Sequence, residues 1–146
     1  MKSVLKLVGI FTFLFILSCE KEGKLNYSEK RIVGEWYYSK VKITEKGRLK
    51  TETITDSYAG RTIEFLPNFD MEFKDEINNI SYSGVWDLIS STSDDECINT
   101  IFASYTNDEN GEIVQLVFEN ISVTYKKLTA RFSTKNERYN YVLLKK

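Results

Sequence analysis

Along most of the chain, hydrophobic and polar residues alternate in short runs. The runs are rich in Tyr, Phe, Ile, Val and Thr and are separated by Gly, Asn, Asp and Ser. Such a period of two is typical of half-buried strands joined by turns. The one helix that we expect is a short lead-in from Asn26 to Val33, with Ser28 as a cap. The pattern therefore predicts an all-β domain.

The first expected strand runs from Gly34 to Thr44. Trp36 and Tyr38 fall on one of its faces, whereas Val41 and Ile43 fall on the other. A β-bulge inserts one residue and changes which face the following side chains occupy. A bulge or twist within this strand would therefore bring both pairs inward.

The clearest hairpin joins Arg61–Leu66 to the strand that contains Met71 and Phe73, through a tight turn at 67–70. Polar residues predict loops at 45–58 and 90–96, the former with a ragged strand around Leu49–Ile54. Further strands are expected at Ser83–Ile89, Ile98–Tyr105, Ile113–Glu119, Ile121–Tyr125, Leu128–Phe132 and Arg138–Lys145. We expect these short antiparallel strands to close into an up-and-down barrel of about eight strands, because closure removes exposed edges. The interior of such a barrel is either packed with side chains or holds one small ligand.

The first residues follow a different pattern. Lys2 and Lys6 precede an apolar run from Leu7 to Leu17, which ends at Ser18 and Cys19. A basic start followed by a short apolar run indicates a secretory signal. The run is too short for a comfortable membrane span, which takes about 20 apolar residues.

The residues Ile16-Leu17-Ser18-Cys19 resemble the lipobox of bacterial lipoproteins. The resemblance implies cleavage before Cys19 and attachment of lipid, including fatty acids such as palmitate, to its sulfur. It predicts a signal peptide at 1–18, a lipidated flexible tether at 19–30 and a barrel domain at 31–146. The expected location is the bacterial cell envelope, on the periplasmic or the surface face of the outer membrane. The alternatives are an ordinary cleaved signal with a chance cysteine and an uncleaved membrane anchor.

The charged segment 20–24, Glu-Lys-Glu-Gly-Lys, loosely resembles the export tag of surface lipoproteins of the Bacteroidetes. A plain solvated linker is the alternative interpretation. The chain of 146 residues has a net charge of −1, and removal of residues 1–18 with their two lysines leaves −3. No nucleic-acid partner is expected, because phosphate binding needs a basic stripe.

The chain contains no histidine. Histidine is the commonest general base and a usual ligand of zinc and copper, so its absence disfavours most catalytic triads and most such metal sites. We expect no enzyme, no cofactor and no metal site. Carboxylate chemistry at Glu64, Glu72 and Asp87 would require their strands to turn these residues inward. Lipidation of Cys19 would leave Cys97 without an intrachain partner, as a structural or incidental thiol.

Two further segments carry a resemblance to a family. Gly34-Glu35-Trp36 begins the first strand, and Tyr82-Ser83-Gly84-Val85-Trp86 occurs in the middle of the domain. With the strand order and the closing segment 121–146, they resemble lipocalin-like lipoproteins of the Bacteroidetes. The resemblance implies that the Trp36 indole packs across the closed end of a barrel. It also implies that a basic residue such as Arg131 or Arg138 packs on that indole.

Two functions remain open. The first is a binding module that holds a small hydrophobic or amphipathic ligand within the barrel. The second is a structural or interaction lipoprotein with a packed barrel, whose exposed aromatic residues or loops contact a partner. The membrane is an expected partner through the lipid, and the oligomeric state stays open. The candidate ligand-binding residues, for which ordinary core packing is the alternative, are Trp36, Tyr38, Phe65, Phe73, Trp86, Tyr105, Phe118, Tyr125, Phe132 and Tyr141.

Overall fold

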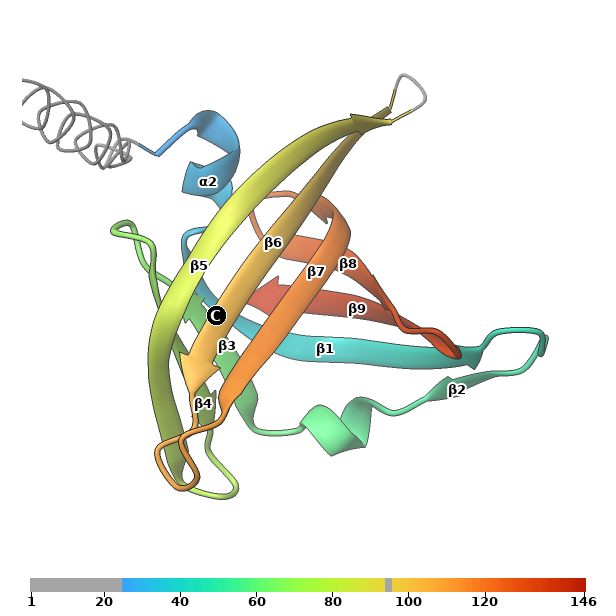
Figure 1. Ribbon diagram of the computed structural model, residues 1–146, viewed down its shortest axis with the longest axis horizontal. Coiled ribbons are helices and arrows are strands. Elements are labelled where there is room, and N and C mark those ends of the chain that lie inside the picture. Colours follow the sequence, from blue (N-terminus) through green and yellow to red (C-terminus); the bar gives the residue numbers. More distant parts are fainter. Residues whose placement is uncertain (1–24, 94–95) are drawn as a thin grey trace, which may run out of the picture.

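The computed structural model describes residues 25–93 and 96–146, which form a barrel of antiparallel strands with a short helix at one end (Figure 1). Nine strands follow one another in the order β2-β1-β3-β4-β5-β6-β7-β8-β9, and β1 also pairs with β9. This last pairing closes eight strands into a barrel and leaves β2 as an extra strand beside β1. The all-β, up-and-down barrel predicted from the sequence is therefore confirmed.

The strands of the barrel follow one another in chain order as a meander, and two short helices accompany them. The helix α2 spans Tyr27–Ile32, and a 3-10 helix, η1, spans Thr55–Tyr58. The strands are β1 (Gly34–Glu45), β2 (Thr51–Thr53), β3 (Arg61–Phe65), β4 (Asp70–Asp75), β5 (Ile80–Ser93), β6 (Glu96–Thr106), β7 (Ile113–Val123), β8 (Lys127–Ser133) and β9 (Glu137–Lys145).

The pairing of β1 with β9 runs over almost the whole of both strands, from Trp36 opposite Lys145 to Glu45 opposite Glu137. The register shifts between Tyr38 and Lys40, which is the bulge predicted from the sequence. Tyr38 and Val41 are three residues apart, so a regular strand would place them on opposite faces. Because of the bulge, both side chains are buried. The bulge turns the second half of β1 so that it continues the barrel wall.

The helix α2 begins with a capping box. Asn26 accepts a hydrogen bond from the backbone N–H of Glu29, and the Glu29 carboxylate accepts one from the N–H of Asn26. The expectation of Ser28 as the cap was wrong, because Asn26 satisfies the free N–H at the helix start. Ile32 is fully buried and Leu25 packs against the core, so contacts with the barrel begin within the segment 19–30 expected to be a tether.

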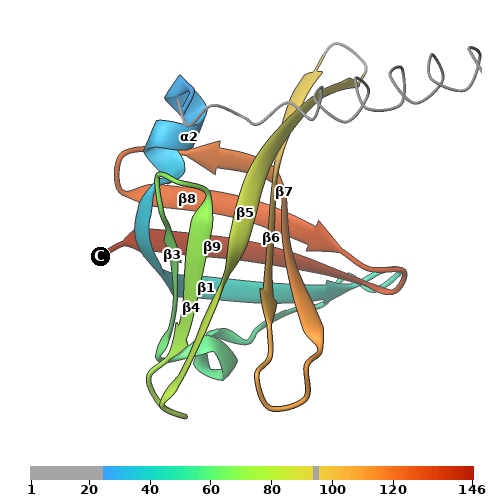
Figure 2. The ribbon, with the colours of Figure 1, turned by 60° about the vertical axis from the view of Figure 1, so that its left-hand side comes forward.

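Two strand expectations were wrong. The polar residues Ser90 to Ser93, expected to form a loop, continue β5 and pair with β6 as far as Glu96. Their ribbons extend past the rest of the barrel, at the end where α2 also lies (Figures 1 and 2). A polar sequence suits strands that project beyond the core. In addition, the two strands expected at 113–119 and 121–125 are one strand, β7, with an irregularity at Asn120, whose φ is 48°.

Trp36 closes the end of the barrel near α2, as the sequence predicted. Its side chain is fully buried, and its indole N–H donates a 2.7 Å hydrogen bond to the carbonyl of Ile32. The cation above the indole is Lys145, with Nζ 5.1 Å from the ring centroid. The expectation of Arg131 or Arg138 there was wrong, because both alternate with inward-facing residues and are exposed.

Gly84 marks the closest approach of β5 to β6. A Cβ at this position would lie 1.9 Å from the carbonyl oxygen of Ser104, a backbone atom of the paired strand. We predict that Gly84→Ala lowers the free energy of unfolding by about 1–3 kcal/mol, the usual range for overpacking. Urea unfolding of the purified protein measures this. Ser83→Ala, an exposed neighbour, is the control and should be near neutral; equal midpoints for the two variants would contradict the prediction.

Candidate functional site

The barrel wall is incomplete where β7 meets β8. These strands pair from Glu119 opposite Arg131 to Val123 opposite Leu128. The preceding residues, Ile113–Phe118, pair with β6 but have no strand on their other side among the residues that the structure describes. β8 ends at Ser133, and the Thr134 hydroxyl then accepts a hydrogen bond from the N–H of Glu137 and fixes the turn. We call the gap between Ile113–Phe118 and the end of β8 the seam.

A cavity of about 280 Å³ lies at the seam, on the inner side of the wall. Strands β1, β3, β4, β6, β7, β8 and β9 and the 3-10 helix η1 all contribute to it. Aromatic rings dominate its lining, together with aliphatic side chains of β7 and one cation. The lining residues are Tyr38, Tyr58, Arg61, Phe73, Tyr105, Val114, Gln115, Leu116, Val117, Phe118, Phe132 and Tyr141.

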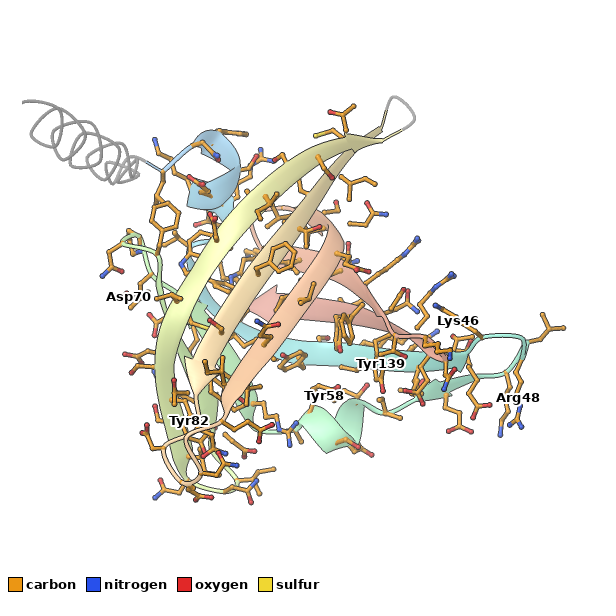
Figure 3. All side chains as sticks on the ribbon, viewed as in Figure 1. Lys46, Arg48, Tyr58, Asp70, Tyr82 and Tyr139 are labelled. Atoms are coloured by element: carbon orange, nitrogen blue, oxygen red, sulfur yellow. The ribbon has the colours of Figure 1, made fainter. Side chains whose placement is uncertain are left out.

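One wall of the cavity is a cluster of tyrosines. The ring centroids of Tyr38 and Tyr58 are 4.9 Å apart, and each lies 6.0 Å from the Tyr141 centroid. The Phe118 ring meets that of Tyr141 edge to face, with centroids 5.6 Å apart, and the Tyr139 ring stacks on that of Tyr141, with centroids 6.2 Å apart. In Figure 3 Tyr58 lies at η1, and Tyr139 lies beside β1 near the start of β9. These contacts hold the rings in place, since aromatic pairs contribute about 0.5–1.5 kcal/mol beyond burial.

Three further rings with nearly parallel planes extend the aromatic surface. The ring centroid of Tyr105 lies 5.1 Å from that of Phe73 and 5.0 Å from that of Tyr82, and the centroids of Phe73 and Tyr82 are 6.4 Å apart. The hydroxyl of Tyr82 donates a 3.2 Å hydrogen bond to the side-chain carbonyl of Asn107, in the turn after β6. In Figure 3 Tyr82 lies near the lower ends of β4 and β5.

Arg61 is the one charged residue in the cavity lining. Its guanidinium carbon lies 5.5 Å from the centroid of the Tyr58 ring, and its Nε lies 3.2 Å from an oxygen of Asp75. Asp75 is buried and also accepts hydrogen bonds from the side chain and backbone of Asn78. The Asn78 donors, with Arg61 beside them, hold the pKa of Asp75 below its usual range. The carboxylate thus stays ionised and compensates much of the arginine charge.

The tyrosine hydroxyls give the cavity polar groups that carry no charge. Burial raises the pKa of Tyr38 above its ordinary value, and burial together with neighbouring Tyr58 does the same for Tyr141. A raised pKa keeps these hydroxyls protonated at neutral pH. The cavity therefore combines ring faces and neutral hydroxyls with a single paired cation, a surface suited to a largely apolar molecule with a few polar groups.

Six of the ten candidate residues come together in this lining: Tyr38, Phe73, Tyr105, Phe118, Phe132 and Tyr141. Trp36, Phe65 and Trp86 are buried away from it. Trp86 packs on Phe65 and Phe69 and donates a hydrogen bond to the carbonyl of Leu66, which supports the β3–β4 turn. Tyr125 lies outside the cavity, with 82% of its side chain exposed in the turn between β7 and β8.

Sequence reasoning missed Tyr58, Arg61 and the β7 residues around Leu116. Arg61 precedes inward-facing Ile63 by two positions, and Val114 and Leu116 share the phase of Phe118, so alternation alone could have found them. Tyr58 had no such signal, because it belongs to a one-turn helix within a polar segment. Its place in the cavity depends on Thr55, whose hydroxyl accepts a hydrogen bond from the backbone N–H of Val41.

The carboxylates considered for catalysis face outward. Glu64 and Glu72 both lie within 3.5 Å of the Lys74 ammonium on the outer surface, and Asp87 lies between inward-facing Trp86 and Leu88. Within residues 25–93 and 96–146, no group of three or more His, Cys, Asp or Glu side chains is arranged to hold a metal ion. Cys97 is an exposed free thiol.

The expected signal peptide at 1–18, the expected lipidation site at Cys19 and the charged segment 20–24 lie outside the described residues. No helix within the described part of the chain has the length and apolar character needed to cross a membrane. The expectations about export and anchoring therefore stay predictions.

Tyr38 and Tyr141, two of the buried tyrosines, predict a fall in stability at alkaline pH. Because folding raises the pKa of Tyr38 and Tyr141, the folded state favours their neutral forms. That contribution is complete below about pH 10, where tyrosines of the unfolded chain begin to ionise, and is lost as pH rises further. We expect each to lower the free energy of unfolding by up to about 1.4 kcal/mol per pH unit above pH 10. Urea unfolding between pH 8 and 11 measures this; Tyr38→Phe should reduce the slope, whereas Tyr125→Phe should leave it unchanged.

No family model, no curated protein and no solved structure matches the chain.

Proposed function

We propose that this chain is a lipid-anchored protein of the bacterial cell envelope that binds a small hydrophobic or amphipathic ligand in its barrel. The observation that carries the proposal is the ring-lined cavity of about 280 Å³ at the seam. Ligand sites of proteins are concave, mostly apolar and equipped with a few oriented polar groups, and the mouths of barrels are common places for them.

The lining limits the ligand that fits. The cavity volume of about 280 Å³ lies just below the range of about 300–1,000 Å³ that is usual for ligand sites, which favours a small molecule. Tyr38, Phe118 and Tyr141 offer ring faces and edges to an apolar body. Arg61 and the tyrosine hydroxyls offer hydrogen bonds to a polar end. The paired Asp75 reduces the charge of Arg61, so a neutral or weakly anionic polar group suits the cavity better than a strongly charged one.

The anchoring part of the proposal is supported by the sequence around Cys19. The apolar run from Leu7 to Leu17 ends directly at Ser18-Cys19, as the lipobox resemblance requires. Lipid on a cysteine with two or more acyl chains gives a stable membrane attachment, since each buried methylene contributes about 0.8 kcal/mol. A barrel on such an anchor would meet apolar molecules at a membrane surface, where they are most abundant.

The outer face of β5 and β6 favours a second candidate, an interaction lipoprotein. Val85 and Ile89 on β5 and Phe102 on β6 point outward, with 57%, 49% and 44% of their side chains exposed. Grouped exposed apolar residues are typical of contact surfaces between proteins. This candidate needs no ligand in the cavity, so occupancy of the cavity distinguishes the two functions.

Val114→Trp tests the cavity. The larger side chain should occupy space beside Leu116 and exclude a ligand. We expect the purified protein to enhance the fluorescence of N-phenyl-1-naphthylamine, a neutral and largely apolar probe, and we expect the variant to weaken this binding at least tenfold. Ser81→Trp adds the same side chain at an exposed site of β5 and should leave binding unchanged.

Native mass spectrometry of protein purified from envelope membranes provides the second readout. A ligand mass on the parent chain that is absent from Val114→Trp supports a ligand site in the cavity. Equal probe binding by both tryptophan variants, with no retained mass on the parent, would favour the interaction function instead.

Cys19→Ala tests the anchor separately. If Cys19 carries the lipid, a radiolabelled fatty acid should label the parent protein and not the variant, and the variant should leave the membrane fraction. Cys97→Ala is the matched control, because it removes the other cysteine of the chain and should preserve both labelling and membrane association. An unlabelled parent protein would refute the lipoprotein assignment without affecting the cavity.

A further inference from the structure

A second concave surface lies on the outside of the barrel, where β8, β9 and the β1–β2 connection meet. Two adjoining hollows of about 330 and 350 Å³ share Arg131 and Arg138. We call them together the basic groove. One hollow includes the segment Thr44–Arg48 with Asn140, and the other includes Ile98, Thr100, Glu119, Asn120 and Ser133.

The strand register brings the two arginines together. Arg131 lies opposite Asn140, and Arg138 lies opposite Ser133 on the same β8–β9 pair. Residues with this relation are diagonal neighbours on one face, with Cα atoms about 7–8 Å apart. Arg131 falls between Ala130 and Phe132, which face inward, so the groove and the cavity lie on opposite faces of the same strands. The two sites are therefore separate.

The groove carries more positive than negative charge. Lys46, Arg48, Arg131 and Arg138 contribute four cationic side chains, and Glu45 and Glu119 contribute two carboxylates. Glu45 forms an ion pair of 2.9 Å with Arg48. Among the described residues, neither Arg131 nor Arg138 forms an ion pair within 4 Å, although Glu119 lies opposite Arg131 in the register.

Two neighbouring guanidinium groups without ion-pair partners repel one another, and an oxyanion between them would remove that repulsion. A guanidinium binds carboxylate, sulfate or phosphate oxygens through two parallel hydrogen bonds. Lys46 is held at the end of the groove by a 2.6 Å hydrogen bond from its ammonium to the carbonyl of Thr134. In Figure 3 Lys46 and Arg48 lie at the far end of β1, away from α2.

The other lining groups are short, neutral and polar. Thr44, Thr100, Asn120, Ser133 and Asn140 place hydroxyls and amides between the cations. Such groups match the hydroxyls of a sugar chain. No aromatic side chain lines either hollow, whereas proteins that bind single-stranded nucleic acid rely on stacking rings. Ile98 is the only large apolar side chain of the lining, which disfavours insertion into a lipid surface.

We propose that the basic groove binds an acidic polysaccharide, with the guanidinium groups of Arg131 and Arg138 on its carboxylate, sulfate or phosphate groups. The length of two joined hollows suits an extended chain better than a single ion. The site is independent of the cavity ligand, because it uses the outer face of the barrel.

Fluorescence anisotropy on the full chain, purified in a nonionic detergent, tests this proposal. The probes are labelled oligosaccharides of heparin and of polygalacturonate, with neutral dextran as the uncharged comparison. We expect binding of at least one acidic probe that weakens as salt is raised, and no binding of dextran. Arg131→Gln with Arg138→Gln should weaken the binding at least tenfold.

The control removes two positive charges elsewhere, through Lys30→Gln in α2 with Lys126→Gln in the β7–β8 turn, and should change the affinity less than twofold. Arg131→Lys with Arg138→Lys keeps the charge but loses the two-pronged geometry, so an intermediate loss is expected and guards against a glutamine variant that fails to fold. Three outcomes would overturn the proposal. The first is no binding of either acidic probe, and the second is an equal loss of affinity in the Arg131→Gln/Arg138→Gln variant and in the Lys30→Gln/Lys126→Gln control. The third is arginine-dependent binding to vesicles with anionic lipids or to single-stranded DNA in preference to the oligosaccharides.

Discussion

The pairing of the first strand with the last determines what the rest of this molecule can be. β1 and β9 join residues that are about 90 to 110 positions apart. Their ladder from Trp36 to Glu45 removes the two edges that the meander would otherwise expose. The bulge between Tyr38 and Lys40 lets one long strand serve both ends of the barrel. Without it, either Tyr38 or Val41 would face water. The bulge therefore lets β1 pair with β9 along its length and also bury both of these side chains.

Closure divides the interior into two parts with different properties. Near α2, Trp36 is completely enclosed, its N–H is bonded to Ile32, and Lys145 covers its ring, so this end is solid. At the other end the wall opens at the seam, and tyrosines and phenylalanines surround free volume. A barrel of this kind can hold a cavity without losing its fold, because only a few of the core residues line the cavity.

Much of this arrangement could be predicted from the alternation of residues. Alternation predicted the barrel, the β3–β4 hairpin, the bulge in β1 and six of the cavity residues, because each depends on which face of a strand a side chain occupies. It failed at Ser90–Ser93, where the strands extend past the core and neither face needs apolar residues. It failed at Tyr58 as well, since a single helical turn held by Thr55 has no periodic pattern. The lysine on Trp36 was missed because the register of the last strand, which sets it, is a tertiary property.

The seam also affects how the wall of the cavity can move. A strand in the middle of a sheet must break hydrogen bonds on both sides before it can swing outward. Ile113–Phe118 pair with β6 alone among the described strands, so displacement of this stretch towards the seam disrupts no ladder with β8. Local opening is cheapest where few backbone hydrogen bonds are lost. For the ligand proposed above, this gives a route into the cavity by a sideways motion of half a strand, with the β1–β9 closure intact.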